Sequence, residues 1–372
     1  MVAPKIGIVG VGGVARYAHL PAYRRLGLDV HALFDVDEPV AREVARQFQV
    51  PVVAGSLEEL AGRVDVVDLA TPPAGRIELL RRLAALGTPV LVQKPLCTTW
   101  AELAEAAALR STGMRLRLNL TGRHVSAWRK VAELLVAGAI GRPHLCTIVN
   151  RDWWDRAPGR WDHSLPGYIV YEMLIHHLDL LRFWFGPPQR IAARGGTHPG
   201  QLLRQANWVS ALIEYGSGPL AQVLEDWTMP EYGFAHGHPF EEVLISGSAG
   251  VLRAGSERVE LSPVGGNQVR VWHLPRPGQT LPGEQLAVNW FPDSFGAAMN
   301  DFLATRDDPV VSASDWAQAL ALTADTIVAA ESLGASRWLD FPPEDPVVPG
   351  VRTGRATAFA DGGTSMVRGS NR

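Results

Sequence analysis

Short apolar runs alternate with amphipathic segments along the first 120 residues of the chain. The apolar runs cover residues 5–9, 29–34, 64–69, 89–92 and 115–118, and the helix-like segments cover residues 17–26, 39–48, 76–86 and 99–109. Buried parallel strands read as continuous apolar runs, and regular alternation with helices predicts one parallel sheet covered on both faces. Residues 1–120 are therefore predicted to form a doubly wound Rossmann domain of the α/β class.

The pattern changes after about residue 140. Strand-like runs at 209–215, 220–227, 242–246, 258–261 and 269–273 follow one another with little helix between them, which indicates a mostly antiparallel sheet. Helices are predicted at 168–185, 294–304 and 314–333. Residues 121–345 are assigned to a C-terminal α+β domain. Residues 346–372, rich in Gly, Pro, Ser and Thr, are predicted to form a disordered tail.

Composition narrows the class of protein. The 372 residues are 47% hydrophobic and 20% charged, and the net charge of −3 gives no electrostatic reason to expect nucleic acid or an anionic membrane as a partner. No apolar run is long enough to span a bilayer, and the chain enters a strand at once, without a signal peptide. Cys97 and Cys146 suggest neither a disulfide framework nor a metal site. We expect a cytoplasmic protein whose partner is a small molecule.

A glycine-rich turn joins the first strand to the first helix. Its pattern is G-x-G-x-x-A, in which Gly10 permits a tight turn, Gly12 lets the backbone approach a pyrophosphate, and Ala15 allows close helix–strand packing. Such turns also occur without a ligand. The candidate cofactor-binding residues of this turn are Gly10, Gly12, Gly13 and Val14.

An acidic residue stands at the end of the second strand. Asp35 lies where a carboxylate accepts hydrogen bonds from the adenosine ribose of a dinucleotide. A carboxylate there repels a 2′-phosphate, so NAD is favoured over NADP. The alternative is that Asp35 only starts a turn with Asp37.

Lysine is scarce in this chain: only Lys5, Lys94 and Lys130 occur among the 35 Lys and Arg residues. Lys94 follows an apolar strand, next to the crevice where doubly wound sheets bind ligands. An ammonium placed there can stabilise the alkoxide that develops as hydride leaves a carbinol. The alternative is a surface lysine in a turn.

The chain resembles the glucose–fructose oxidoreductase / inositol dehydrogenase / MocA family. The matching pieces occur along this chain in the same order as in the family. They are the segments 10–15, 70–73, 94–95, 138–141, 176–179 and 246–250, together with Asp35. The resemblance implies a Rossmann domain followed by a domain with a large open sheet that often mediates oligomerisation, here as a homodimer or homotetramer. It also implies that the substrates are sugars, polyols or related hydroxy compounds.

The same resemblance implies contacts near the nicotinamide. Thr71 and Pro72 match the turn that approaches this end of the cofactor, and Gln93 precedes the family's lysine, here Lys94. The chain departs from the family at Gln93, where glutamate is usual. A carboxylate beside the lysine would hold it charged more strongly than an amide does.

A polar stripe is predicted on the helix at 168–185. Glu172, His176 and Asp179 are spaced by four and three residues, so they share one face, which Tyr168 extends. The resemblance implies that His176 is the acid/base for the reacting hydroxyl. It also implies that Glu172, where the family commonly has aspartate, assists it, and that Asp179 binds or orients a substrate hydroxyl. The alternative is a satisfied buried network. His177 points roughly 100° away and is interpreted as structural.

Selectivity is assigned to the region before this helix. A cluster of aromatic and charged side chains suits a sugar face or, equally, a dimer contact; it comprises Arg151, Asp152, Trp153, Trp154, Arg156, Arg160 and Trp161. Trp153 and Arg123 are the candidate substrate contacts. By residue type, His176, His177 and Asp179, or His236 and His238, could ligate a zinc ion. Adjacent histidines point apart and no third ligand has recognisable spacing, so no metal is expected.

These observations predict an NAD(H)-dependent oxidoreductase. Lys94 polarises the oxygen of a sugar- or polyol-like carbinol or carbonyl, and His176 exchanges its proton. The alternative is a nicotinamide-binding sensor or regulatory protein without efficient chemistry. A further variant is an enzyme that reduces an imine or an unsaturated ring with the same side chains as proton donors.

Overall fold

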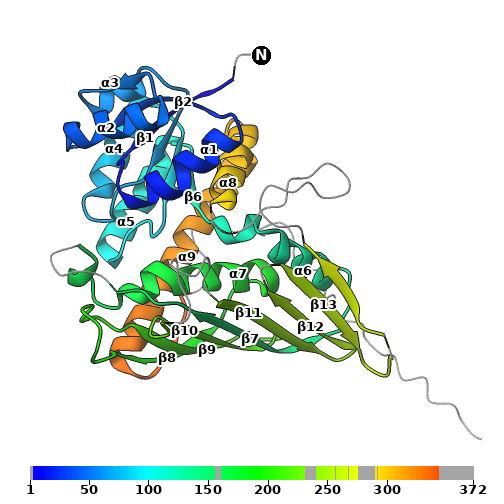
Figure 1. Ribbon diagram of the computed structural model, residues 1–372. Helices are drawn as coiled ribbons and strands as arrows, with labels where there is room; N and C mark the ends of the chain where they lie inside the picture. Colours follow the sequence, from blue (N-terminus) through cyan, green and yellow to red (C-terminus); the bar gives the residue numbers. More distant parts are fainter. Residues whose placement is uncertain are drawn as a thin grey trace, which may run out of the picture.

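The computed structural model describes residues 3–155, 161–230, 240–255, 257–266, 268–274, 290 and 292–342. Two layered units follow one another along the chain, with the parallel sheet in the upper one and a broad second sheet in the lower one (Figure 1). The predicted tail at 346–372 lies outside the described residues, as do Arg156, Arg160, His236 and His238.

The first unit is built on six parallel strands in the order β3-β2-β1-β4-β5-β6. The strands are β1 (Lys5–Val9), β2 (Asp29–Phe34), β3 (Val52–Val53), β4 (Val66–Leu69), β5 (Val90–Gln93) and β6 (Leu116–Asn119). The helices between them are η1 (Ala15–His19) continuing into α1 (Leu20–Arg25), α2 (Glu38–Phe48), α3 (Leu57–Ala61), α4 (Arg76–Leu86) and α5 (Trp100–Leu109), followed by the turn η2 (Arg110–Thr112). This strand order confirms the predicted Rossmann domain. The pattern missed only β3 and α3, both short.

A helix from late in the chain completes this unit. Helix α8 (Asp293–Thr305) packs against α1 and β6, and Figure 1 shows it beside the N-terminal helices. Arg117 of β6 fixes it by donating hydrogen bonds to Asp301, at 2.7 Å, and to Thr305, at 2.9 Å. The first sheet is therefore covered on one side by residues nearly 200 positions further along, as the Arg117–Asp301 bond shows.

The second unit contains nine strands in the order β14-β13-β12-β11-β7-β10-β9-β8-β15. The strands are β7 (Pro143–Arg151), β8 (Arg190–Gly196), β9 (Trp208–Glu214), β10 (Leu220–Asp226), β11 (Phe240–Gly247), β12 (Gly250–Gly255), β13 (Arg258–Pro263), β14 (Arg270–His273) and β15 (Trp338–Asp340). Its helices are α6 (Ser126–Val136), η5 (Val170–Leu174), α7 (Ile175–Phe185) and α9 (Pro309–Ala335), with the turns η3 (Thr121–His124) and η4 (Trp161–Ser164). Among the strand pairs of this sheet within the described residues, only β10 and β7 run parallel, which confirms a mostly antiparallel sheet.

The faces of this sheet differ. Along β9, Val209, Ala211 and Ile213 are buried against the helix layer, whereas the alternate residues Ser210 and Leu212 are only partly covered. Helices α6 and α7 lie between the sheet and the Rossmann unit (Figure 1). The carboxyl ends of the parallel strands of the first sheet therefore face α7. The candidate active site lies between these strand ends and α7.

Two predicted α-helices begin with a π turn. The helix expected at 17–26 begins as η1, and the helix expected at 168–185 contains η5 before the regular α7. Short π segments inside helices widen a turn and shift the side-chain register on either side. This matters for the second helix because η5 carries Glu172 and α7 carries His176.

Candidate active site

The glycine turn after β1 has the geometry expected for a dinucleotide site. Gly10 has φ +87°, and a Cβ there would lie 3.0 Å from Thr71 Cγ2 and 3.1 Å from the backbone of Ala70. Gly12 has open space in place of a side chain, with nothing within 4 Å. The turn thus leaves its backbone accessible, and the structure brings Thr71 against it, as the predicted cofactor site requires.

Asp35 lies directly beside this turn. Its Oδ2 accepts a hydrogen bond from Val11 N at 2.8 Å, and its Oδ1 accepts one from Asp37 N at 3.0 Å. The turn interpretation of Asp35 therefore describes part of its role. A carboxylate has about four acceptor sites, so capacity remains for ribose hydroxyls.

The Thr71 turn is fixed by a buried arginine that the sequence pattern did not single out. Arg76, at the start of α4, is 1% exposed, and its guanidinium donates hydrogen bonds to the backbone oxygens of Thr71, Gln93 and Pro95. Burial lowers the pKa of Arg76 to about 9. Since one side chain ties the loops after β4 and β5 together, the Thr71 turn and Lys94 are held as one rigid edge. The Thr71 hydroxyl is buried and has no hydrogen-bond partner among the residues that the structure describes, and a bound cofactor can supply one.

Lys94 is buried between the two units. Its Nζ donates to the Glu172 carboxylate at 2.8 Å and to the Glu172 backbone oxygen at 2.7 Å. The side chain of Lys94 is 9% exposed and that of Glu172 is 28% exposed. An ammonium has three donors. Within the part of the chain described, Lys94 Nζ uses two of them, so the third is available to a substrate oxygen.

Glu172, which contacts Lys94 through both its backbone oxygen and its carboxylate, lies within the π turn η5. The wider η5 turn shifts the normal i to i−4 hydrogen-bond pattern, and the Glu172 carbonyl accepts the bond from Lys94. The long glutamate side chain then curls back to the same ammonium.

His176 lies one turn later in the same helix. It is 7% exposed, and its ring meets the edge of Trp290 at 5.2 Å between centroids. Burial, then the charges of Lys94 and His177, lower the pKa of His176 well below its usual value. Its ring nitrogens form no hydrogen bond with the described residues, so a neutral imidazole stands free beside the lysine.

His177 has the opposite environment. Its Nδ1 contacts Glu225 at 2.5 Å and its Nε2 contacts Glu241 at 2.6 Å. Burial opposes protonation, but the charges and hydrogen bonds of the two carboxylates raise the pKa of His177 to about 10. His177 thus anchors α7 to β10 and β11 as an imidazolium, in line with its structural interpretation, and it also supplies one of the charges that act on His176.

The predicted polar stripe divides into separate groups. Asp179 is 1% exposed and pairs with Arg123, whose Nε lies 2.8 and 2.9 Å from the two carboxylate oxygens. Burial raises the pKa of Asp179 although Arg123 opposes this. Tyr168 packs against Trp227 at 5.7 Å between ring centroids. Only Glu172 and His176 of the stripe are therefore grouped with Lys94, and the two candidate substrate contacts Asp179 and Arg123 engage each other.

The aromatic cluster is also divided. Trp153 is 37% exposed, pairs with Thr228 in an isolated bridge and packs edge-on against His198 at 6.4 Å between centroids. Trp154 packs against Trp227 at 5.9 Å. The contacts of Trp153 are thus made just beyond the ends of the central strands β7 and β10, and the ring beside His176 is Trp290 instead. Trp290 lies outside the cluster at 151–161 and outside the predicted strands and helices, so no local signal pointed to it.

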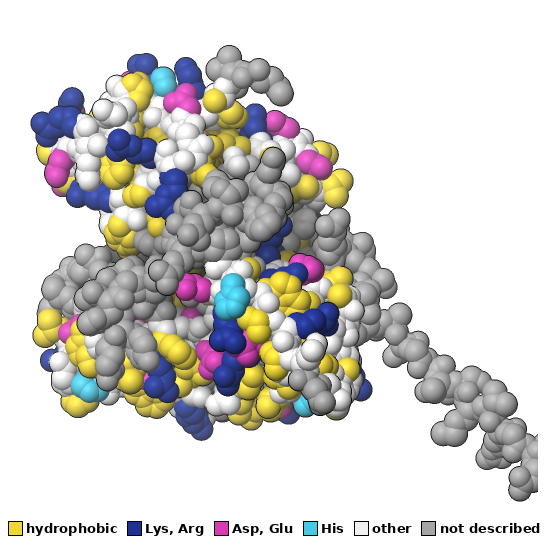
Figure 2. All heavy atoms as spheres, turned by 45° about the vertical axis from the view of Figure 1, so that its right-hand side comes forward, with side chains coloured by type: hydrophobic (Ala, Val, Ile, Leu, Met, Phe, Trp, Pro, Cys, Tyr) yellow, Lys and Arg dark blue, Asp and Glu magenta, His cyan; other side chains and the backbone are white. Residues whose placement is uncertain are grey.

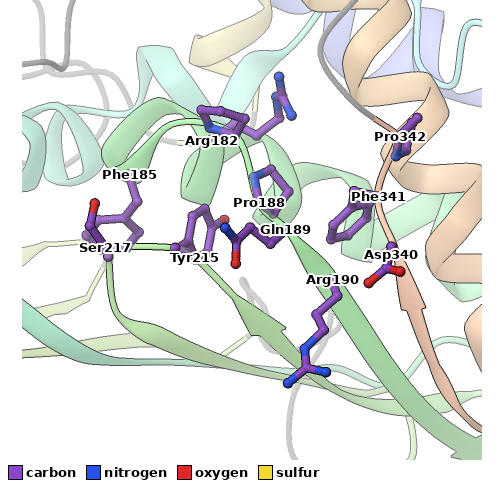
Figure 3. A pocket seen from close by; sticks show the side chains of 13 residues that line it. Arg182, Phe185, Pro188, Gln189, Arg190, Tyr215, Ser217, Asp340, Phe341 and Pro342 are labelled. Atoms are coloured by element: carbon purple, nitrogen blue, oxygen red, sulfur yellow. The ribbon is translucent and has the colours of Figure 1, made fainter.

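A separate hollow of about 650 Å³ opens at the far end of α7. Figure 3 shows Tyr215, Gln189, Arg190, Asp340 and Phe341 around it, with no residue of the Lys94 group. Its arginines already have carboxylate partners, since Arg182 bonds Asp325 at 2.6 Å and Arg190 bonds Glu214 at 2.6 Å. The residues that line this hollow thus include none of the side chains that the sequence predicts for the reaction.

The remaining features to consider are metal-ligand groups, membrane-spanning helices and surface charge. No three His, Cys, Asp or Glu side chains within the described ranges are arranged to hold a metal ion. None of the helices that the structure describes has the length and apolarity needed to cross a membrane; the cytoplasmic location stays a prediction. In Figure 2, basic and acidic side chains are interspersed over the described parts of the visible face.

Comparison with known families gives two matches. Residues 4–119 match the model described as "Oxidoreductase family, NAD-binding Rossmann fold", and residues 128–253 match the model described as "GFO/IDH/MocA C-terminal domain". Together the two models cover well over half of the chain.

The sequence identity between this chain and individual relatives is low. D-apiose dehydrogenase of Paraburkholderia graminis is 27% identical over 263 residues, which is 69% of each protein. Inositol 2-dehydrogenase of Rhizobium meliloti is 23% identical over 260 residues, 68% of this chain and 76% of that one. The structure of a levoglucosan dehydrogenase in complex with NADH and levoglucosan superposes with a TM-score of 0.77 at 18% identity, covering 92% of this chain and all of the other. At this identity the superposition shows a shared fold.

Proposed function

Because the chain belongs to the GFO/IDH/MocA oxidoreductase family, we propose that it transfers a hydride between NAD and a secondary hydroxyl or carbonyl of a sugar, polyol or related compound. The observation that carries this proposal is the group formed by Lys94, Glu172 and His176. A buried ammonium with one donor left lies beside a neutral imidazole, at the carboxyl edge of a Rossmann sheet.

The family assignment establishes the coarse chemistry. The protein is an oxidoreductase with an NAD-binding Rossmann domain. The finer assignment of residues is our proposal: the turn Gly10, Gly12, Gly13 and Val14 holds the pyrophosphate, Asp35 binds the adenosine ribose, and Thr71, Pro72 and Gln93 lie at the nicotinamide end.

The roles follow from charge and protonation. NAD, when bound, supplies the hydride acceptor. In the oxidative direction Lys94 donates a hydrogen bond to the substrate oxygen and stabilises its developing negative charge. His176, neutral because of burial and its cationic neighbours, takes the hydroxyl proton. Glu172 accepts a hydrogen bond from the Lys94 ammonium and so orients it toward the substrate oxygen. Reduction reverses these steps.

The substrate class rests on relatives. The named relatives include an apiose dehydrogenase, inositol 2-dehydrogenases and a 1,5-anhydro-D-fructose reductase. All three names denote carbinol or carbonyl chemistry on polyhydroxylated molecules. We extend this class to the present chain, with the Arg123–Asp179 pair and Trp153 as candidate selectivity elements.

The test is turnover of purified protein. A panel of aldoses, anhydrosugars and cyclitols with NAD⁺, and of the matching ketones with NADH, is expected to give substrate-dependent change in nicotinamide absorbance. A sensor without chemistry would bind NADH and give no turnover with any member. The Lys94–Glu172 contact favours the enzyme, since a binding protein has no need of an oriented buried ammonium.

Cofactor preference gives a second prediction. Asp35→Ser combined with Val36→Arg removes the carboxylate that repels a 2′-phosphate and adds a partner for it, at a position where Val36 is 96% exposed. We expect the ratio of NADPH to NADH affinity to rise at least about tenfold, as for a charge-assisted hydrogen bond. Fluorescence titration of both cofactors measures this ratio. Unchanged ratios would remove Asp35 from the ribose site.

We also propose that the chain assembles as a homodimer or homotetramer through the second sheet. The face turned away from α7 presents Val149, Leu212, Leu224 and Leu244, on four neighbouring strands, all only partly covered. We place the division between the units near residue 120, with residues 1–120 as the cofactor domain, to which α8 adds, and residues 121–345 as the substrate domain.

A further inference from the structure

Four polar side chains form a continuous buried chain beneath Lys94. The Tyr23 hydroxyl donates to Asp68 Oδ2 at 2.7 Å, and the same oxygen lies 2.6 Å from His19 Nδ1. On the other side of the ring, His19 Nε2 lies 3.2 Å from Gln93 Nε2. Tyr23, Asp68 and His19 are 0% exposed and Gln93 is 6% exposed. The chain runs from α1 across β4 to the end of β5.

The last link reaches the backbone of the lysine. Gln93 Oε1 accepts a hydrogen bond from Lys94 N at 2.8 Å. Because a backbone N–H can only donate, the Gln93 atom facing it must be the amide oxygen. The amide nitrogen is then the atom that faces His19, which fixes the orientation of this amide without any assumption about the histidine.

The protons of His19 follow from the same argument. An amide nitrogen can only donate, so His19 Nε2 must accept and carries no proton. The proton of the neutral ring therefore lies on Nδ1, which donates to the carboxylate of Asp68. Burial, then the charge of Asp68 and its hydrogen bond, raise the pKa of Tyr23 well above its usual value, so Tyr23 remains a donor. Each link from Tyr23 to Lys94 then joins a donor to an acceptor, with Asp68 Oδ2 accepting two bonds. The further contact of 3.3 Å between His19 Nδ1 and the Tyr23 hydroxyl is compatible with this assignment, because a hydroxyl oxygen can also accept.

We propose that Gln93 and His19 are positioning residues of the reaction centre, which hold Lys94 through a buried chain with His19 in its neutral, Nδ1-protonated form. This rests on the proposed role of Lys94. Glu172 fixes the tip of the lysine from the second unit, and Gln93 fixes its backbone from the first. The ammonium is thus located from both ends, which orientation of a catalytic group requires.

A double-mutant cycle tests the positioning role. Gln93→Leu removes both hydrogen bonds with little change in volume and is expected to lower kcat about tenfold, the effect of about one buried hydrogen bond. In a Lys94→Ala background the same change is expected to cost less than about twofold, because there is no ammonium left to position. Gln47→Leu, on the exposed side of α2, is the matched control. Circular dichroism establishes that each variant is folded.

The outcomes separate this inference from the proposed function. If Lys94→Ala itself retains activity, the proposed function fails. If Lys94→Ala is impaired and Gln93→Leu costs the same in both backgrounds, Gln93 acts in some other way and the positioning role is wrong.

Histidine nitrogen NMR of the cofactor-free protein provides a readout independent of activity. The His19 signal, assigned by its loss in His19→Gln, is expected to show a protonated Nδ1 and a bare Nε2. Gln93→Glu still accepts from Lys94 N but faces Nε2 with an acceptor, so His19 is expected to become doubly protonated at neutral pH. A wild-type His19 with its proton on Nε2, or on both nitrogens, would overturn the proposed chain.

Discussion

Replacing Lys94 with alanine is expected to lower kcat by about 100- to 1,000-fold, the effect of removing one donor from a developing oxyanion. Affinity for NADH is expected to change little, because the ammonium bonds Glu172 and faces the substrate oxygen in our proposal. Steady-state kinetics with the substrate found by the panel, together with NADH titration, separates the two effects. Lys94→Arg is expected to be impaired as well, since a guanidinium does not fit a site with 9% exposure and a neighbouring π turn.

The matched control is Lys130→Ala. Lys130 is also a lysine with a carboxylate partner, Glu133, at 2.7 Å, but it lies on the surface of α6. It is expected to retain full turnover. Comparable activity of the two alanine variants would remove Lys94 from the mechanism.

The Rossmann unit was predictable because its signals are local. Each buried parallel strand is a continuous apolar run, and β2 and α4 begin and end at the predicted residues. The second unit was harder. Strand β7 is interrupted by exposed His144 and Leu145, and β8 carries two small residues and two glycines, so neither has the alternation by which strands are recognised.

Part of the site was predictable for the same reason. Lys94 follows a strand that must end at the crevice, and the structure brings it to Glu172, which the sequence analysis had assigned only as an assistant of His176. The stripe itself assumed ideal α-helical spacing. The π turn at 170–174 broke that spacing, and sequence periodicity contains no signal for it.

The two departures from the family become intelligible only in three dimensions. Gln93 offers an amide to His19, 74 residues away along the chain, and leaves the lysine without a carboxylate neighbour in sequence. Glu172, 78 residues away, is one methylene longer than aspartate and contacts the ammonium at 2.8 Å. Pairings over such separations are set by tertiary packing, as is the contact of Trp290 with His176, and local patterns do not specify them.

Replacing His176 with asparagine is expected to lower turnover at neutral pH by about 100- to 10,000-fold, the usual contribution of a positioned acid/base. Asparagine is similar in size and keeps a polar group next to Trp290, so the variant is expected to fold. Exposed His144→Asn is the control and is expected to leave turnover unchanged. Kinetics of His176→Asn and of the wild type in both directions of the reaction would show whether proton transfer is lost with the ring.

The pH dependence of the wild type follows from the same side chain. Burial, Lys94 and His177 lower the pKa of His176 well below 6.5, so the neutral base needed for oxidation persists on the acid side of that value. The acid limb of kcat/KM for oxidation that is assigned to His176 is therefore expected well below pH 6.5.

The stability of the folded protein is also expected to fall in acid because of His176. As the pH falls below 6.5, the unfolded chain binds a proton at residue 176 that the folded chain does not bind, so the native state loses stability. His176→Asn is expected to remove that part of the acid sensitivity in thermal melts. An acid limb near 6.5 in oxidation would show that burial and the two cationic neighbours do not hold His176 neutral. Wild-type turnover of His176→Asn would show that His176 is not the base, and wild-type acid sensitivity of its melting would show that residue 176 does not contribute to the loss of stability.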